Sequence, residues 1–228
     1  MKLTTTRTDN IPLLICGEDS DKAFLFVHGI GGNKEEAIRF AEIAGKHGWQ
    51  TYAVDLPEHN SRTDPAKLVP WEVIPELRKV MDYIKSRAKS VSVRATSIGA
   101  YFSLLAFQGE RIDKCLLASP LTDMTEMIAG LMAINGVTDE ELRENGEIEV
   151  PGQTLSWRYL TFAREHPVRA LCETDILYGS NDEIIPRKVI DSFVENNPCR
   201  LTVIDSGHWI HTPPAVAEMS AWEDEALK

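Results

Sequence analysis

The chain has 228 residues, of which 43% are hydrophobic and 26% are charged. This composition is typical of a folded globular protein and excludes an intrinsically disordered chain. The 24 Lys and Arg residues against 35 Asp and Glu residues give a net charge of −11. An acidic chain without a continuous Lys/Arg stripe is not built to bind phosphate backbones, so we expect no nucleic-acid partner.

Targeting signals and the distribution of cysteines indicate in which cellular compartment the protein is expected. Near the N-terminus, Pro12 and Gly17 bracket only a handful of apolar residues, too few for a signal peptide. No segment approaches the roughly 18 apolar residues of a transmembrane helix, so we expect no membrane insertion. The four cysteines lie far apart without a CxxC pair, and we expect buried free thiols at Cys16, Cys115, Cys172 and Cys199. These features predict a reducing, cytoplasmic location.

Short β-branched or aromatic runs alternate with amphipathic stretches along the chain. Strands are predicted at 11–16, 22–27, 50–55, 90–95, 114–119, 175–178 and 200–204, and helices at 35–47, 71–87, 98–108, 186–196 and 214–226. The acidic GEDSD turn predicts a hairpin between the first two of these strands. The alternation predicts an α/β fold, with a mostly parallel central sheet flanked by helices on both faces.

Residues 121–168 break the alternation of strands and helices, because they contain no convincing strand of the main sheet. We expect them to form a small cap insertion between the core segments 1–120 and 169–228. Apolar side chains at helical spacing predict a helix that starts near Met124. An acidic run follows, then a hairpin that turns at Pro151-Gly152, and then a helix capped by Ser156. Apolar side chains of the insertion either form a simple core or line a substrate pocket; the candidates for the pocket are Met124, Met127 and Trp157, together with Trp209 outside the insertion.

The string VSVRATSIGAYFSLLAF carries the most specific chemistry. A β-branched strand runs into Ala95-Thr-Ser97-Ile-Gly99, and an apolar helix starts at once, which is the context of a nucleophile elbow. In such a turn, small neighbours let strand and helix pass closely, and the serine hydroxyl is lifted out of the sheet. The alternative is that Ser97 only caps the helix.

Two backbone N–H groups are candidates for an oxyanion hole. Ile98 follows the proposed nucleophile at the helix N-terminus, where N–H groups are unpaired. Ile30 lies in the string VHGIGGN, whose glycines let a backbone N–H swing toward the site. His28, in the same string, is interpreted as a structural hydrogen-bonding residue rather than a base.

Two further strings supply a carboxylate and an imidazole. In YGSNDEIIP, Asp182 lies just past a strand end, where the crevice of an α/β sheet binds ligands; a simple turn role is the alternative. We expect Glu183 to point elsewhere. In VIDSGHWIH, His208 follows the last strand more directly than His211, which we interpret as a loop residue.

The order Ser97, Asp182, His208 is the one expected for α/β-hydrolase triads. With VHGIGGNKEEA and YGSNDEIIP, residues 22–228 resemble the α/β-hydrolase superfamily, above all its small esterases and acylglycerol-lipase-like or serine-aminopeptidase-like members. The string Asp55-Leu-Pro-Glu-His-Asn-Ser also resembles the D-x-P-G-H-G-x-S loop of that family.

The chain departs from the family pattern at several positions. Ala95 replaces the first elbow glycine, and it is small enough to fit. Glu58 and Asn60 replace two glycines of the loop after the third predicted strand, which leaves the conformation of that loop open. Asp123 lies where some family members carry the triad acid, although the sequence around Asp182 favours Asp182.

The resemblance implies a serine hydrolase that cleaves a carboxylic ester of a small or medium apolar molecule through an acyl-enzyme. It implies neither a metal nor an organic cofactor. The same triad would also support a thioesterase, peptidase, acyltransferase, perhydrolase or C–C bond hydrolase, since a fold does not fix a function. A non-catalytic binding protein with the same scaffold is the alternative from another class.

Overall fold

The computed structural model describes residues 1–60 and 62–228, so that Ser61, the last residue of the Asp55 motif, lies outside the described residues. The chain divides into two compact units, one of Met1–Leu121 with Arg169–Lys228 and one of Thr122–Val168. The first predicted boundary, between residues 120 and 121, differs from this division by one residue, and the second, between 168 and 169, coincides with it.

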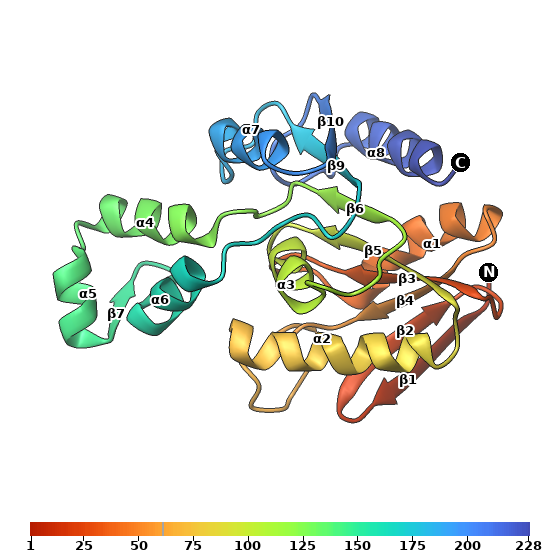
Figure 1. The fold of residues 1–228 in the computed structure, drawn as a ribbon, viewed down its shortest axis with the longest axis horizontal. Helices are drawn as coiled ribbons and strands as arrows, with labels where there is room; N and C mark the ends of the chain where they lie inside the picture. The colour runs from red at the N-terminus through yellow and green to blue at the C-terminus, as the bar shows by residue number, and fades with distance from the viewer. Residues whose placement is uncertain (61) are drawn as a thin grey trace. The chain divides into compact units, whose positions relative to one another are not determined.

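The first unit is built on an eight-stranded sheet with the order β1-β2-β4-β3-β5-β6-β9-β10 (Figure 1). Its strands are β1 (Leu3–Thr8), β2 (Ile11–Cys16), β3 (Lys22–Val27), β4 (Gln50–Val54), β5 (Ser90–Thr96), β6 (Cys115–Ala118), β9 (Thr174–Gly179) and β10 (Cys199–Ile204). All neighbours from β4 to β10 pair in parallel, whereas β1 with β2 and β2 with β4 are antiparallel. The predicted mostly parallel α/β sheet is confirmed.

The predicted hairpin between residues 11–16 and 22–27 is wrong. β2 pairs with β1 on one side and with β4 on the other, while β3 lies between β4 and β5. The hairpin of the structure is instead β1–β2, in which Thr8 pairs with Ile11 across a turn where Asp9 has a φ of 50°. β1 was missed because its sequence LTTTRT is mostly polar, as suits an exposed edge strand.

Helices cover both faces of the sheet (Figure 1). α2 (Pro70–Lys85) and α3 (Ile98–Ala106) pack on one another on one face, and α1 (Ala37–Lys46), preceded by a short 3₁₀ turn at Lys34–Glu36, packs against α8 (Pro213–Ala226) on the other. α7 (Arg187–Glu195) lies beside β10. These five helices agree with the predicted ranges to within two residues at every end.

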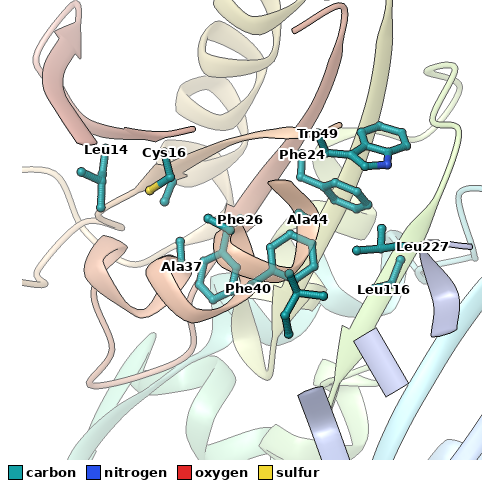
Figure 2. Packing of buried hydrophobic residues seen from close by; sticks show 13 residues of the cluster. Leu14, Cys16, Phe24, Phe26, Ala37, Phe40, Ala44, Trp49, Leu116 and Leu227 are labelled. Atoms are coloured by element: carbon teal, nitrogen blue, oxygen red, sulfur yellow. The ribbon is translucent and has the colours of Figure 1, made fainter. Parts of the chain in front are cut away.

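Aromatic side chains fill the core between β3 and α1 (Figure 2). The ring of Phe24 meets Phe40 edge to face at 5.0 Å and lies 4.7 Å from the ring of Trp49. Edge-to-face pairs of this kind stabilise a core beyond the area that they bury. Cys16 lies in the same cluster and Cys115 is also buried, but Cys172 and Cys199 are only half-buried, so the prediction of four buried thiols is wrong for these two; all four are free thiols.

A buried ion pair joins β5 to α8. Arg94 is 2% exposed, and its Nε donates to Glu223 Oε1 at 2.9 Å, while Arg39 from α1 donates to the same carboxylate. Arg94 also donates to the Ala95 carbonyl and to Thr96 Oγ1, directly before the strand ends. A buried charge needs such partners, because an unpaired one is strongly destabilising.

The second unit contains α4 (Met124–Asn135), α5 (Asp139–Asn145), the antiparallel pair β7 (Glu147–Val150) and β8 (Gln153–Ser156), and α6 (Trp157–Glu165). The acidic run forms α5, a helix that was not predicted from the sequence. A capping box starts α5: Thr138 accepts from the Glu141 N–H, and the Glu141 carboxylate accepts from the Thr138 N–H. Ser156 caps α6 as predicted, accepting from the Tyr159 N–H.

No helix among the described residues combines the length and apolar composition that crossing a membrane requires.

Candidate active site

The functional candidates of the first unit lie on loops that follow β3, β5, β9 and β10. These four strands run parallel, so their carboxyl ends meet at one edge of the sheet. Crevices at this edge are where open α/β sheets bind ligands.

Ser97 forms the turn between β5 and α3 and has φ 50° and ψ −122°. Such a conformation is strained for a residue with a Cβ and persists only where the surroundings fix it. The Ser97 N–H donates to the Ala118 carbonyl at 3.1 Å, and the Ser97 carbonyl accepts from the N–H groups of Ala100 and Leu121. Its side chain makes no capping hydrogen bond to the helix, contrary to the helix-cap alternative.

Gly99 explains why this turn needs small residues. A Cβ on Gly99 would lie 2.2 Å from the His28 carbonyl oxygen and 2.8 Å from the Val27 carbonyl oxygen. The first turn of α3 therefore passes directly against the end of β3, which only glycine allows. This approach brings the loop after β3 to the serine: a Cβ on Gly29 would lie 3.1 Å from Ser97 Cβ.

A chain of hydrogen bonds connects Ser97, His208 and Asp182. Ser97 Oγ lies 2.9 Å from His208 Nε2, and His208 Nδ1 lies 2.8 Å from Asp182 Oδ2. An ionised carboxylate only accepts, so Nδ1 carries the proton and the Nε2 lone pair accepts the serine hydroxyl. The structure thus brings together the three residues singled out from the sequence.

The Asp182 carboxylate is fully buried at its side chain, and both of its oxygens are used. Oδ2 accepts from His208, and Oδ1 accepts from the N–H groups of Ile184 at 2.9 Å and Ile185 at 2.8 Å. These donors compensate the desolvation of the charge and fix the position of the carboxylate beside the imidazole.

Glu183 corrects one prediction, because its side chain does not point away from the site. Glu183 Oε2 accepts from the backbone N–H of His208 at 3.2 Å and lies 3.0 Å from where a Cβ on Gly207 would be. A second carboxylate therefore fixes the backbone of the histidine loop. The sequence offered no signal for this beyond the adjacency of Glu183 to Asp182.

His28 orients the peptide that carries the Ile30 N–H. The carbonyl of Gly29 accepts from His28 Nδ1 at 2.7 Å and from the Gly32 N–H at 3.1 Å. The Gly29–Ile30 peptide is planar, so fixing this carbonyl aims the Ile30 N–H in the opposite direction. His28 Nε2 accepts from the Leu56 N–H at 3.0 Å, so both ring nitrogens are used by backbone groups.

The second oxyanion candidate is the Ile98 N–H, the first of α3. N–H groups in the first turn of a helix have no intrahelical acceptor, and they carry the positive end of the helix dipole. The two candidate donors thus come from the two loops that meet at Gly99.

The other two candidates, His211 and Asp123, make local contacts within their own loops and helix ends. His211 is exposed, and its Nδ1 donates to the Trp209 carbonyl. Asp123 caps α4 by accepting from the Glu126 N–H at 2.9 Å. In the described part of the chain, no group of three or more His, Cys, Asp and Glu side chains is arranged to hold a metal ion.

The four pocket candidates differ in exposure. In the second unit, Met124 is buried, Met127 and Trp157 are half-buried, and the Arg164 guanidinium lies 5.7 Å from the centre of the Trp157 ring. In the first unit, Trp209 is 77% exposed beside His208. Their role as pocket residues stays a prediction.

Solved structures resemble this chain over its whole length, although no protein-family model and no curated protein matches its sequence. Alpha/beta hydrolase domain-containing protein 10 from mouse is 15% identical, with a TM-score of 0.77 over 99% of this chain and 98% of that one. The chain has the α/β-hydrolase fold.

Two further solved structures are similar to this chain over nearly its whole length. Est1E from Butyrivibrio proteoclasticus, in a structure with ferulic acid bound, is 18% identical, with a TM-score of 0.77 over 97% of this chain and 96% of that one. The Pyrococcus furiosus esterase Pf2001 is 17% identical, with a TM-score of 0.69 over 99% and 90%. At these identities the likeness establishes the fold.

The burial of His28 predicts a loss of stability in acid. Burial lowers the pKa of His28 from 6.5 to about 4, against the smaller raising effect of its hydrogen bond to Gly29. Between these values the unfolded chain binds a proton that the folded chain does not, so stability is full at pH 7 and falls as the pH drops from 6.5 toward 4. The contribution of His28 is about 3 kcal/mol.

Urea unfolding of the wild type and of His28→Gln at pH 7 and pH 4 measures this contribution. The difference in unfolding free energy between the two pH values should be smaller in the variant by that amount. An NMR titration in which the His28 ring of the folded protein protonates near 6.5 would contradict the assignment.

Proposed function

We propose that this chain is a serine hydrolase that cleaves carboxylic esters of small or medium apolar molecules. The observation that carries the proposal is the hydrogen-bonded series Ser97 Oγ, His208 and Asp182 at a strained turn between a strand and a helix. This is the arrangement that activates a serine hydroxyl as a nucleophile.

In the proposed reaction, Ser97 Oγ attacks the ester carbonyl carbon while His208 Nε2 takes the hydroxyl proton. The tetrahedral intermediate places its negative oxygen against the N–H groups of Ile30 and Ile98. When the C–O bond breaks, His208 returns the proton to the departing alcohol, which leaves an acyl group on Ser97. Asp182 stays ionised and stabilises the imidazolium.

The second half of the reaction repeats these steps with water. His208 Nε2 takes a proton from water as its oxygen attacks the acyl carbonyl, and the same two N–H groups hold the second oxyanion. Collapse of that intermediate returns the proton to Ser97 Oγ and releases the carboxylic acid. The chain's own residues therefore supply every proton transfer, and the proposal includes no cofactor.

Ester chemistry is supported by the names of two structural neighbours, an esterase and a protein that holds a carboxylic acid, ferulic acid. We further propose that Thr122–Val168, inserted in the chain between β6 and β9, serves as a cap that contributes Met124, Met127 and Trp157 to an apolar acyl or aryl pocket. In the first unit, Trp209 beside His208 is proposed as a further pocket residue.

Removing the nucleophile tests the proposal. We expect Ser97→Ala to lower kcat on a short p-nitrophenyl ester by about 10⁶-fold, because the covalent step is lost. Ser192→Ala, on the exposed face of α7, is the matched control and should keep wild-type turnover. Near-normal turnover of Ser97→Ala across a panel of esters, thioesters and aminoacyl amides would contradict the proposal.

The choice of Asp182 over Asp123 as the triad acid is tested separately. We expect Asp182→Asn to lower kcat by about 10³- to 10⁴-fold, because an amide at this position favours the wrong imidazole tautomer. Asp123→Asn keeps a good helix cap on α4 and should leave kcat unchanged. The reverse pattern in steady-state kinetics would assign the acid to Asp123.

A further inference from the structure

The loop after β4 contacts the proposed oxyanion loop through His59. His59 Nε2 lies 3.0 Å from the Gly31 N–H, and His59 Nδ1 lies 2.8 Å from the Pro57 carbonyl oxygen. A carbonyl only accepts and an N–H only donates, so Nδ1 carries the hydrogen and Nε2 offers a lone pair. This pattern exists only in the neutral imidazole.

Residues on both sides of His59 are held in an unfavourable conformation. Glu58 has φ 64° and Asn60 has φ 49°, the left-handed region that favours glycine. The Glu58 carboxylate accepts from Lys67 Nζ and from the Leu68 N–H, both at 2.9 Å. Asn60 Nδ2 lies 3.2 Å from Asp55 Oδ2. Side-chain hydrogen bonds thus maintain the conformation that presents His59 to Gly31.

The two loops are also joined on either side of this contact. Lys34 Nζ donates to the buried Asp55 carboxylate at 2.7 Å, and the Leu56 N–H donates to His28 Nε2. Between these points the apex of the oxyanion loop lacks packing: Ile30 is 69% exposed, and a Cβ on Gly31 would have no atom within 4 Å. The base of this apex is fixed at the Gly29 carbonyl by His28 and the Gly32 N–H, and the hydrogen bond to His59 restrains the apex itself at Gly31.

We propose that neutral His59 is a positioning residue, which holds Gly31 so that the neighbouring Ile30 N–H stays directed at the oxyanion. The inference rests on the proposed hydrolase function. A second proton on His59 would place an N–H against the Gly31 N–H and break the contact. The hydrogen bond at Gly31 therefore exists only while His59 is neutral, a requirement separate from that of a neutral His208.

The environment of His59 contains groups of both signs. The ring of His28 lies 4.9 Å away, centre to centre, and stays neutral because it is buried. The charged groups that surround His59 or its loop include Glu35, Glu36, Asp55, Glu58, Lys34, Lys67 and Arg62. Lys34 pairs with both Asp55 and Glu35, and Lys67 pairs with Glu58, so three of the four carboxylates have a lysine partner.

The test compares His59→Leu, which removes the acceptor, with His59→Gln, whose amide oxygen keeps an acceptor that cannot be protonated. On a short p-nitrophenyl ester at pH 8, His59→Leu should lower kcat by about 10- to 100-fold with KM within about threefold, because the oxyanion exists only after attack. His59→Gln should restore kcat to within about fivefold of the wild type. His47→Leu, at the end of α1 beside Asp224, should match the wild type.

A second readout does not depend on turnover. In the wild type, the ¹⁵N–¹H resonance of Gly31 should shift with the same midpoint as the His59 ring, and in His59→Gln this shift should disappear. The same measurement decides the matter if His59→Leu does not fold.

Two results would overturn the inference: wild-type kcat in a folded His59→Leu, or a Gly31 resonance that ignores His59 protonation. If the proposed hydrolase function is wrong, the wild type will show no Ser97-dependent turnover. The Gly31 titration would still report on the hydrogen bond between Gly31 and His59 in that case.

Discussion

The close approach of α3 to the end of β3 is the constraint on which the site depends. With no side chain at Gly99, the first helical turn lies against the carbonyls of Val27 and His28. That contact forces the positive φ of Ser97 and lifts its hydroxyl to His208. It also brings the loop that carries Ile30 beside the serine. A single backbone approach therefore arranges both the nucleophile and the candidate oxyanion donors.

Imidazoles and carboxylates play different parts around this turn. Three histidines, His28, His59 and His208, each have an Nδ1 donor and an Nε2 acceptor, so each acts as a neutral connector. Of these, only His208 contacts Ser97 through a nitrogen. The carboxylates of Asp182 and Glu183 fix the ring and the backbone of His208, respectively. In the proposed mechanism one imidazole moves protons while the other two hold backbone in place.

The sequence predicted most of the fold and the residues that meet at the site because the signals were local. A β-branched strand followed at once by Ala-Thr-Ser-Ile-Gly predicts the turn, and loop residues after parallel strands converge at one sheet edge. The order of the strands in the sheet was harder to predict from the sequence. β2 pairs with β4 rather than with the next strand, since strand pairing depends on contacts distant in sequence. The polar edge strand β1 carries no apolar alternation to detect.

The features of the site that were not predicted from the sequence are hydrogen bonds between loops. Glu183 reaches the His208 N–H across 25 positions, and His59 reaches the Gly31 N–H across 28, and neither spacing has a sequence signature. The conformation of the loop around His59 could not be predicted, because Glu58 and Asn60 replace glycines of the family pattern. In the structure both residues still adopt the left-handed conformation, and hydrogen bonds of their side chains stabilise it. Helix α5 could have been found, since Thr138 and Glu141 form a capping box visible in the sequence.

The central claim is that Ser97 Oγ becomes covalently acylated. Mass spectrometry of the protein quenched in acid within milliseconds of mixing with excess p-nitrophenyl acetate tests this most directly. We predict one added acetyl group per chain, located by peptide mapping on Ser97 and lost again once the ester is exhausted. Turnover of the ester with no acyl group on Ser97, or with the group on another residue, would contradict it.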